Sequence, residues 1–260
     1  MLIDTHCHLD AREFDPDRDA VITAARTGGI EKIIVPAVSA ENFDAVHALC
    51  PRYPCVLPAY GIHPLYVDRA AESDLRILKE TLRQLAGTPF RAVAVGEIGL
   101  DFYFSSSDAA RQEYFFIEQL KIAREFDLPV LLHGRRAIDA VLKCLRRAGV
   151  TAGIAHAFNG SFRQAENFIR MGFCLGFGGA MTYPGSRRIR KLAASLPIEN
   201  IVLESDAPDI PPVWLAGKRN SPAELPRFAE ELAALRACPV EEIARRTTEN
   251  ALGLLRVDAA

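Results

Sequence analysis

Short apolar and β-branched runs alternate along the chain with longer amphipathic stretches. The short runs predict strands near residues 1–5, 31–36, 55–60, 91–96, 129–132, 151–155, 173–176 and 200–205. In the longer stretches, apolar residues recur at helical spacing. They predict helices near 15–28, 40–49, 72–86, 108–126, 135–148, 161–171, 186–196 and 222–236, and a last helix near 239–255. Glycines stand where several of these helices should end, as Gly149 and Gly172 do.

Strict alternation of strands and helices favours parallel strand pairing through right-handed crossovers. Eight strand–helix units close into a barrel better than they form an open sheet, so the fold class expected is α/β, a (β/α)8 TIM barrel. The chain has 260 residues, a usual length for one such barrel, and shows no linker or low-complexity segment. We therefore expect a single domain over residues 1–260. The longest irregular stretch is 207–222, and long loops in compact domains are often functional.

The composition is that of an ordinary soluble protein, with 49% hydrophobic and 25% charged residues. The formal net charge is −2, so no global positive field would hold the protein on nucleic acid or on an anionic membrane. A polyanionic substrate would need local basic groups or metal ions.

The first residues lead directly into a predicted strand, without the basic and apolar regions of a signal peptide. No apolar run approaches the ~18–20 residues of a membrane span. We therefore expect a cytoplasmic protein without membrane association, and nothing in the sequence indicates an obligate protein partner. The six cysteines form no C-x-x-C pair, which favours reduced and mostly buried thiols.

Histidines and acids occupy the short polar segments that follow the predicted strands. These residues are His6, His8, His63, Glu97, His133, His156 and Asp206. Barrels of this type build their active sites at the face where the strands end. The positions therefore predict a metal site assembled from distant parts of the chain.

The N-terminal pair has the spacing of neighbouring ligands. On an extended strand residues i and i+2 point to the same face, so His6 and His8 can reach one ion while Cys7 points the other way. An isolated H-x-H pattern is weak evidence, because such pairs are often surface or hydrogen-bonded core residues. The other candidate ligands at predicted strand ends strengthen the interpretation of this pair as metal ligands.

The candidate donors are nitrogen and oxygen atoms, with no thiolate among them. Such a set suits Zn²⁺, Mn²⁺, Mg²⁺, Co²⁺ or Fe²⁺ without selecting one. Four histidines and two carboxylates are too many for one catalytic zinc with an open position, and they suit two ions about 3.5–4 Å apart that hold a hydroxide. Glu97 offers two oxygens and could bridge the ions. Glu204 should lie deeper on the same face as Asp206 and support the ligands from behind.

The chain resembles the TatD family of metal-dependent hydrolases and deoxyribonucleases, within the amidohydrolase-like barrels. The resemblance runs nearly end to end, through the segments DTHCHLD, GIHP, GEIGLDF, LPVLLHGRRA, AHAFNGS, FGGAMTYP and ESDAPDIP. Within that family it looks similar to the YjjV-like branch. Where many barrel relatives have a carboxylated lysine, this chain has a glutamate, which favours the TatD-like arrangement.

The resemblance implies roles for the matching ligands. His6 and His8 would bind a first ion, and Glu97 would bridge it to a second. His133 and His156 would bind the second ion. These assignments describe a two-metal centre with a bridging hydroxide.

The same resemblance implies that Asp206 binds the first ion and orients or deprotonates the attacking water. His63 matches a family histidine that contacts substrate instead of metal. The chain departs from the family after His156, where it reads Ala-Phe-Asn-Gly in place of Cys-Phe-(Thr/Ser)-Gly. This departure touches no ligand but puts the substrate preference in doubt.

The function expected is hydrolysis of a phosphoester, with DNA as the substrate that the family implies. Arg135, Arg219 and Asn220 are candidate phosphate contacts, because a guanidinium can bind a phosphate through two parallel hydrogen bonds. Aromatic side chains in the strand-end loops could stack on bases. They are Phe102, Tyr103, Phe104, Tyr183 and Trp214.

Two other functions remain open on the residues alone. The same hydroxide could attack a carbonyl, as in an amidohydrolase that cleaves a C–N or ester bond of a small molecule. The site could also belong to a non-catalytic metal-binding protein, although an intact ligand set at the open face of the barrel argues against this.

Overall fold

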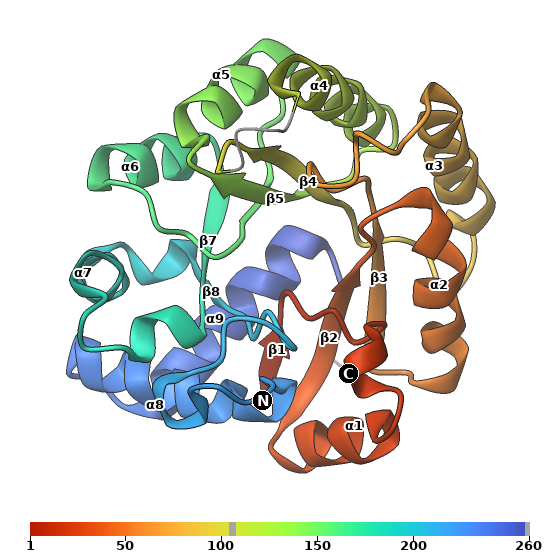
Figure 1. Cartoon of the computed structure of the whole chain (residues 1–260). Coiled ribbons are helices and arrows are strands. Elements are labelled where there is room, and N and C mark those ends of the chain that lie inside the picture. The colour runs from red at the N-terminus through yellow and green to blue at the C-terminus, as the bar shows by residue number, and fades with distance from the viewer. Residues whose placement is uncertain (104–107, 258–260) are drawn as a thin grey trace. The chain divides into compact units, whose positions relative to one another are not determined.

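The computed structural model describes residues 1–103 and 108–257, and within these residues strands alternate with α-helices (Figure 1). The strands are β1 (Leu2–Asp4), β2 (Ile30–Pro36), β3 (Val56–Tyr60), β4 (Ala94–Asp101), β5 (Val130–Arg135), β6 (Gly153–Ala155), β7 (Phe173–Phe177) and β8 (Ile201–Leu203). The helices are α1 (Arg18–Thr27), α2 (Phe43–Arg52), α3 (Glu72–Leu85), α4 (Ala109–Glu125), α5 (Ile138–Ala148), α6 (Phe162–Arg170), α7 (Arg187–Ser195), α8 (Leu225–Arg236) and α9 (Val240–Leu255).

The strands form one sheet of eight in the order of the sequence, from β1 to β8. Neighbouring strands pair in parallel, as β1 does with β2 and β4 with β5. The backbone N–H of Thr5 donates to the carbonyl of Leu203 at 3.1 Å, so the chain leaving β1 also lies beside β8. The expected (β/α)8 TIM-barrel fold class is thus confirmed.

The chain divides into two compact units. Unit 1 comprises Met1–Val35, His156–Phe162 and Cys174–Ala260, and unit 2 comprises Pro36–Ala155 and Arg163–Phe173. The expectation of a single domain over 1–260 remains a prediction.

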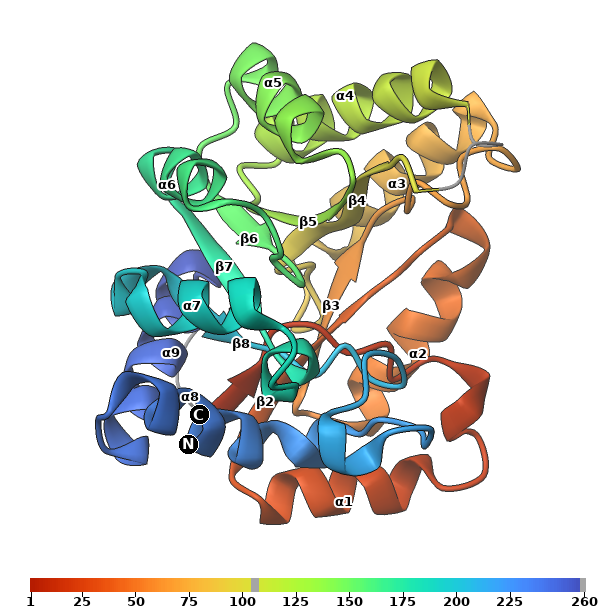
Figure 2. The same ribbon diagram turned by 60° about the vertical axis from the view of Figure 1, so that its left-hand side comes forward.

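The C-terminal helices supply much of the core of unit 1. Helices α8 and α9 pack against β1 and β8 (Figure 2). Their inward faces carry fully buried side chains such as Leu232 and Ile243. Asn250 on α9 donates to the carbonyls of Ile198 and Ile201, which ties the helix to the start of β8. This packing holds the ends of β1 and β8, where histidines and an aspartate follow.

In unit 2, α4 packs on β4 and lies next to α5 (Figure 1, Figure 2). Its buried face combines large apolar side chains, including Phe115 and Leu120, with two glutamines, Gln112 and Gln119. Buried amides are unusual on such a face, because each needs hydrogen-bond partners in the core.

Strands β4 and β5 are longer than the apolar runs predicted, since they continue to Asp101 and Arg135 instead of ending at 96 and 132. Gly99 explains the extra length. Gly99 pairs with His133 and has a φ angle of +149°, which side chains rarely allow. A Cβ atom on Gly99 would overlap the His133 carbonyl, so a larger residue would disturb the pairing. The expected strand ends were therefore wrong here, and Glu97 and His133 lie within strands. Helix bounds were closer, as in 72–86 against Glu72–Leu85.

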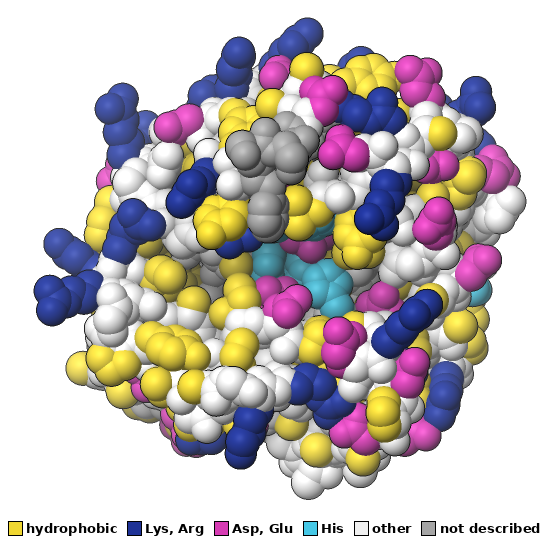
Figure 3. Space-filling model, in the orientation of Figure 1, with side chains coloured by type: hydrophobic (Ala, Val, Ile, Leu, Met, Phe, Trp, Pro, Cys, Tyr) yellow, Lys and Arg dark blue, Asp and Glu magenta, His cyan; other side chains and the backbone are white. Residues whose placement is uncertain are grey.

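No helix of the described residues is long and apolar enough to cross a membrane. The six cysteines are free thiols and all but Cys238 are buried, as expected. Basic and acidic side chains are interspersed over the face drawn in Figure 3, where histidine side chains also reach the surface. This distribution agrees with the small net charge.

Candidate metal centre

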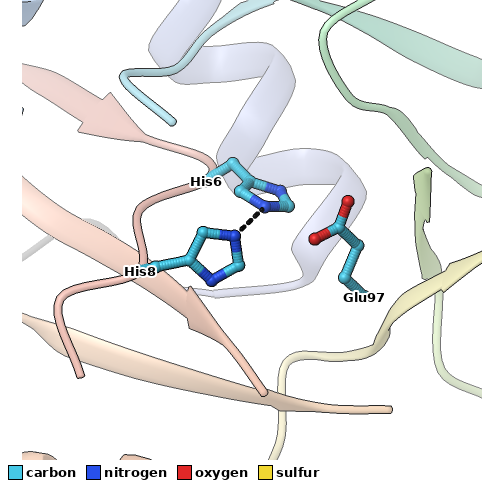
Figure 4. Close-up of side chains that lie close together, drawn as sticks. All are labelled: His6, His8 and Glu97. Carbon is cyan, nitrogen blue, oxygen red and sulfur yellow. Dashed lines mark hydrogen bonds between the residues drawn. The ribbon is translucent and has the colours of Figure 1, made fainter. Parts of the chain in front are cut away.

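The segment after β1 brings two imidazoles together. The Nε2 atoms of His6 and His8 lie 3.3 Å apart, as the dashed line in Figure 4 shows. Cys7 between them is fully buried, and its Sγ lies 3.6 Å from the Ala207 carbonyl. The backbone N–H of Cys7 donates to Ile34 and that of His8 to Ala207, so both neighbouring segments hold this stretch, which lies beyond the end of β1 at Asp4. The two imidazoles therefore point to one place, as the i, i+2 spacing predicts.

Asp206 joins these histidines from the end of β8. Its backbone N–H donates to the His6 carbonyl at 2.8 Å, which fixes it beside the β1 segment. Its Oδ1 lies 3.8 Å from Nε2 of both His6 and His8. Asp206 has φ +55°, a conformation that costs energy for a residue other than glycine and that is common at functional sites.

His156, at the end of β6, completes the group in unit 1. Its ring stacks on His6 with 3.7 Å between centroids, and its Nε2 lies 3.5 Å from Asp206 Oδ1. Its Nδ1 lies 3.1 Å from Glu204 Oε1, which also accepts the Ala157 N–H at 2.6 Å. Glu204 is buried and holds the imidazole so that Nε2 faces the other donors. The expectation that Glu204 acts from behind the ligands agrees with this geometry.

The donor atoms of unit 1 fit a divalent ion. Ligands on one tetrahedral ion at ~2.1 Å stand about 3.4 Å from one another. The separation of 3.3 Å between His6 and His8 matches this spacing, and Asp206 Oδ1 lies 3.8 Å from Nε2 of both histidines. His6, His156 and Asp206 form one of the groups whose donor atoms converge closely enough to hold an ion.

Asp4 lies behind this group on β1. It is fully buried, and its Oδ1 accepts the backbone N–H groups of His6 and Ser205 at 3.2 and 2.8 Å. Burial raises the pKa of the Asp4 carboxyl to about 7, against hydrogen bonds that lower it. Asp4 thus ties the β1 and β8 segments together, a role that sequence reasoning did not assign.

Unit 2 contributes a second group, built on β4 and β5. Glu97 is buried, and its Oε1 lies 3.1 Å from His133 Nδ1; Figure 4 also draws the Glu97 carboxylate. His63 approaches the same oxygen, with its Nε2 at 3.7 Å. His63, Glu97 and His133 form another group that could hold an ion.

Asp101 holds His133 from the other side. Its Oδ2 lies 3.0 Å from His133 Nε2, and its Oδ1 accepts the Tyr103 N–H at 2.9 Å. Burial by itself would raise the pKa of the Asp101 carboxyl, but hydrogen bonds from His133 and Tyr103 outweigh it and lower the pKa. A proton on Nε2 shared with Asp101 leaves the lone pair of Nδ1, on the Glu97 side of the ring, to bind an ion.

Sequence reasoning missed Asp101, although a signal was present. Residues 97, 99 and 101 share one face of a strand, so a strand continuing past Glu97 places Asp101 beside the same ligands. The signal was lost because the apolar run appeared to end at 96.

The surroundings of His63 agree with a role toward substrate. The backbone N–H of Leu65 donates to His63 Nδ1 at 3.2 Å. In a neutral ring the proton is then on Nε2, which becomes a hydrogen-bond donor instead of a metal ligand. The ring lies 4.4 Å from that of His133, so this donor is next to the second group.

Arg135 ends β5, two residues after His133. Its guanidinium stacks on the Tyr103 ring at 3.6 Å, and that of Arg136 lies 4.6 Å from the same ring. All three side chains are exposed. They form a cationic and aromatic surface beside His133, which suits an anionic substrate with a flat ring.

The structure gives the other two predicted phosphate contacts different partners. Arg219 forms a bidentate pair with Asp17, at 2.8 and 2.6 Å, and also donates to the Glu13 carbonyl. Asn220 is fully buried, and its amide donates to three carbonyls of the loop after β8, including that of Ser205 at 2.7 Å. These contacts anchor the long loop that carries both residues.

Two of the predicted stacking residues also have partners. Tyr183 donates to the Pro211 carbonyl, and Trp214 donates to Glu224 while the Arg227 guanidinium covers its ring. Phe102 and Tyr103 are exposed. Phe104 lies outside the described residues.

Comparisons with known proteins identify the family of this chain. The family model described as TatD related DNase matches residues 3–256. "Uncharacterized metal-dependent hydrolase YjjV" of Escherichia coli (strain K12) is 40% identical over 256 residues, which cover 98% of each chain. "Putative deoxyribonuclease tatdn3" of Danio rerio is 32% identical over 97% of this chain and 96% of its own.

The fold agrees equally well with a solved relative. The crystal structure of YjjV from Escherichia coli K12, described as a TatD homolog, matches with a TM-score of 0.94 at 40% identity. The match covers 99% of this chain and 98% of that one. The resemblance seen in the sequence motifs, including that to the YjjV-like branch, is thus confirmed. The chain belongs to the TatD family of metal-dependent hydrolases.

Proposed function

We propose that this hydrolase cleaves phosphoester bonds, with DNA as its substrate class, and that it uses two divalent ions. The observation that carries the proposal is the pairing of each donor group with a buried carboxylate. Glu204 holds His156 in unit 1, and Asp101 holds His133 in unit 2. Carboxylates that orient metal-bound histidines are typical of catalytic metal sites.

The proposed ligands of the first ion are His6, His8 and Asp206. From the family resemblance, His133 and His156 would hold the second ion, and the two oxygens of Glu97 would serve both ions. Such ions would activate a water molecule as the nucleophile and would neutralise charge that develops on the phosphoryl oxygens. The candidate ions are Zn²⁺, Mn²⁺, Mg²⁺, Co²⁺ and Fe²⁺, since ligand sets of nitrogen and oxygen atoms bind all of them.

The remaining chemistry belongs to side chains of this chain. Asp206 would orient the attacking water or take its proton through a carboxylate oxygen. His63 would donate a hydrogen bond from Nε2 to the substrate, because Leu65 keeps its Nδ1 unprotonated. The Arg135 guanidinium, stacked on Tyr103, would bind a neighbouring phosphate. The name of the zebrafish relative and the family description support DNA as the substrate class.

A substrate and metal screen tests the proposal. The purified protein is stripped of metal, reloaded with each of the five ions separately, and assayed on single-stranded DNA, bis-p-nitrophenyl phosphate and simple amides. We expect metal-dependent cleavage of the two phosphoesters. Glu97→Ala and Asp206→Asn should lower kcat by at least about 100-fold, because each removes a proposed metal ligand. Asp206→Asn also removes the carboxylate that would orient or deprotonate the attacking water.

Asp209→Asn is the matched control for Asp206→Asn, since it makes the same change at an exposed position of the same loop. It should keep wild-type activity. If Glu97→Ala and Asp206→Asn cleave DNA as the wild type does, the site assignment is wrong. Cleavage of amides alone would replace the phosphoester proposal with the amidohydrolase alternative.

A further inference from the structure

Two buried glutamines lie on the inner face of α4. Gln112 and Gln119 are 0% and 1% exposed, and they are seven residues apart, which is close to two helical turns. They therefore stand one above the other on the same face. Each binds the backbone of one residue at or just beyond the end of a strand, through both its amide oxygen and its amide nitrogen.

Gln112 binds Asp101. Its Oε1 accepts the Asp101 N–H at 2.8 Å, and its Nε2 donates to the Asp101 carbonyl at 3.0 Å. The next residue, Phe102, donates its N–H to Arg135, so the polar groups of Asp101 point away from β5. Gln112 takes the place of a neighbouring strand there. Asp101 is also the residue whose carboxylate holds His133.

Gln119 binds Ile62 in the same way. Its Oε1 accepts the Ile62 N–H at 2.6 Å, and its Nε2 donates to the Ile62 carbonyl at 3.1 Å. Ile62 lies beyond the end of β3 at Tyr60 and directly precedes His63. Gln119 thus fixes the backbone that carries the proposed substrate-contacting histidine.

Glutamine suits both positions for a chemical reason. Its amide offers one acceptor and two donors, so it can satisfy an N–H and a C=O of the same residue as another peptide group would. An apolar side chain of similar length would leave both buried groups unpaired, and a glutamate would satisfy only the N–H.

We propose that Gln112 and Gln119 are positioning residues for two different parts of the site. Gln112 aligns the Asp101–His133 pair and so acts on metal binding. Gln119 aligns His63 and so acts on the substrate step. The assignment of His133 to a metal ion and of His63 to substrate rests on the proposed function.

Gln112→Met and Gln119→Met remove the amides while keeping side-chain length. In metal-free protein with ¹⁵N-labelled histidine, ring nitrogen chemical shifts report which nitrogen carries the proton. We expect Gln112→Met to change the shifts of His133 and to leave those of His63 as in the wild type. Gln119→Met should do the reverse. Signals are assigned with His63→Gln and His133→Gln.

The two methionine variants should also differ in ion binding and in catalysis. Gln112→Met should weaken divalent-ion binding, measured by calorimetry without substrate, by about 10-fold, as loss of a residue supporting a ligand does. Gln119→Met should bind ions as the wild type does, but at saturating metal its kcat on bis-p-nitrophenyl phosphate should fall. Gln84→Met is the control, because Gln84 is exposed on α3 and its side-chain amide donates to Glu80, far from the strand ends in the sequence.

The proposal is overturned if both methionine variants lower only the melting temperature and leave histidine shifts and ion binding unchanged. It is also overturned if both variants shift both histidines equally. If the methionine variants do not fold, Gln112→Glu and Gln119→Glu replace them, because glutamate keeps the acceptor oxygen. Histidine shifts and ion binding are then measured on these variants. A wild-type protein without phosphodiesterase activity would contradict the proposed function alone, because the shifts are measured without substrate or metal.

Discussion

Each histidine held by a buried carboxylate uses its two ring nitrogens for different purposes. His133 presents Nε2 to Asp101 and Nδ1 to Glu97, whereas His156 presents Nδ1 to Glu204 and Nε2 to Asp206. In both cases the carboxylate decides which nitrogen is left for an ion.

We predict that Asp101→Asn weakens divalent-ion binding by about 10- to 100-fold, the usual effect of losing a carboxylate behind a ligating histidine. The neutral amide lacks the negative charge that stabilises the ring when it binds an ion, and it can turn its own N–H group toward the ring. Calorimetric titration of metal-free protein measures the change. Asp68→Asn, at an exposed loop position of the same unit, should bind ions normally. Equal affinities for the two variants would contradict the role of Asp101.

At the scale of elements, two longer strands shape the site of unit 2. Continuation of β4 and β5 past the predicted ends pairs Gly99 with His133 and Asp101 with Arg135, just after an irregularity of β4 that contains Glu97. The strands could be predicted from their apolar runs, but their length could not. A strand predicted from hydrophobicity ends at the first polar residue. In β4 and β5 the backbone pairing continues through polar residues, so the predicted strands are too short.

Strand β7 makes room for Glu204 in a similar way. A Cβ on Gly176 would overlap the Glu204 carboxylate, whereas one on Gly185, in the loop before α7, would meet nothing within 4 Å. We therefore predict that Gly176→Ala destabilises the protein by about 1–3 kcal/mol through overpacking. It should also weaken ion binding by displacing the carboxylate from His156.

Urea denaturation and calorimetric ion titration measure these two effects. Gly185→Ala makes the same substitution in open space and should leave both quantities near the wild-type values. If Gly176→Ala matches Gly185→Ala in both measurements, Glu204 does not need the space beside Gly176.

At the scale of the whole molecule, the proposed ligands come from segments far apart in the sequence. His6 and Asp206 are separated by 200 residues, yet backbone hydrogen bonds join their segments directly. A divalent ion bound there should favour the folded chain, because an unfolded chain cannot bring these donors together.

We predict that a divalent ion raises the melting temperature reversibly. At an ion concentration 100 times the dissociation constant, the gain in unfolding free energy is about 2.7 kcal/mol for one site. Differential scanning calorimetry with and without ion, and after adding EDTA, measures it. The double variant His6→Ala/His8→Ala should lose most of the gain, whereas His47→Ala, on α2, should keep it. An unchanged melting temperature in EDTA would contradict metal binding to the folded protein.

The sequence by itself determined the alternation of strands and helices and the residue types of the candidate ligands. Both are local properties, because periodicity and strand-end position can be read in short windows. Tertiary structure alone decided the pairing of His133 with Asp101, the binding of Ile62 by Gln119, and the capture of Arg219 by Asp17. These partners are 32, 57 and 202 residues apart, and side-chain direction at such separations is set by packing and register, which no local pattern encodes.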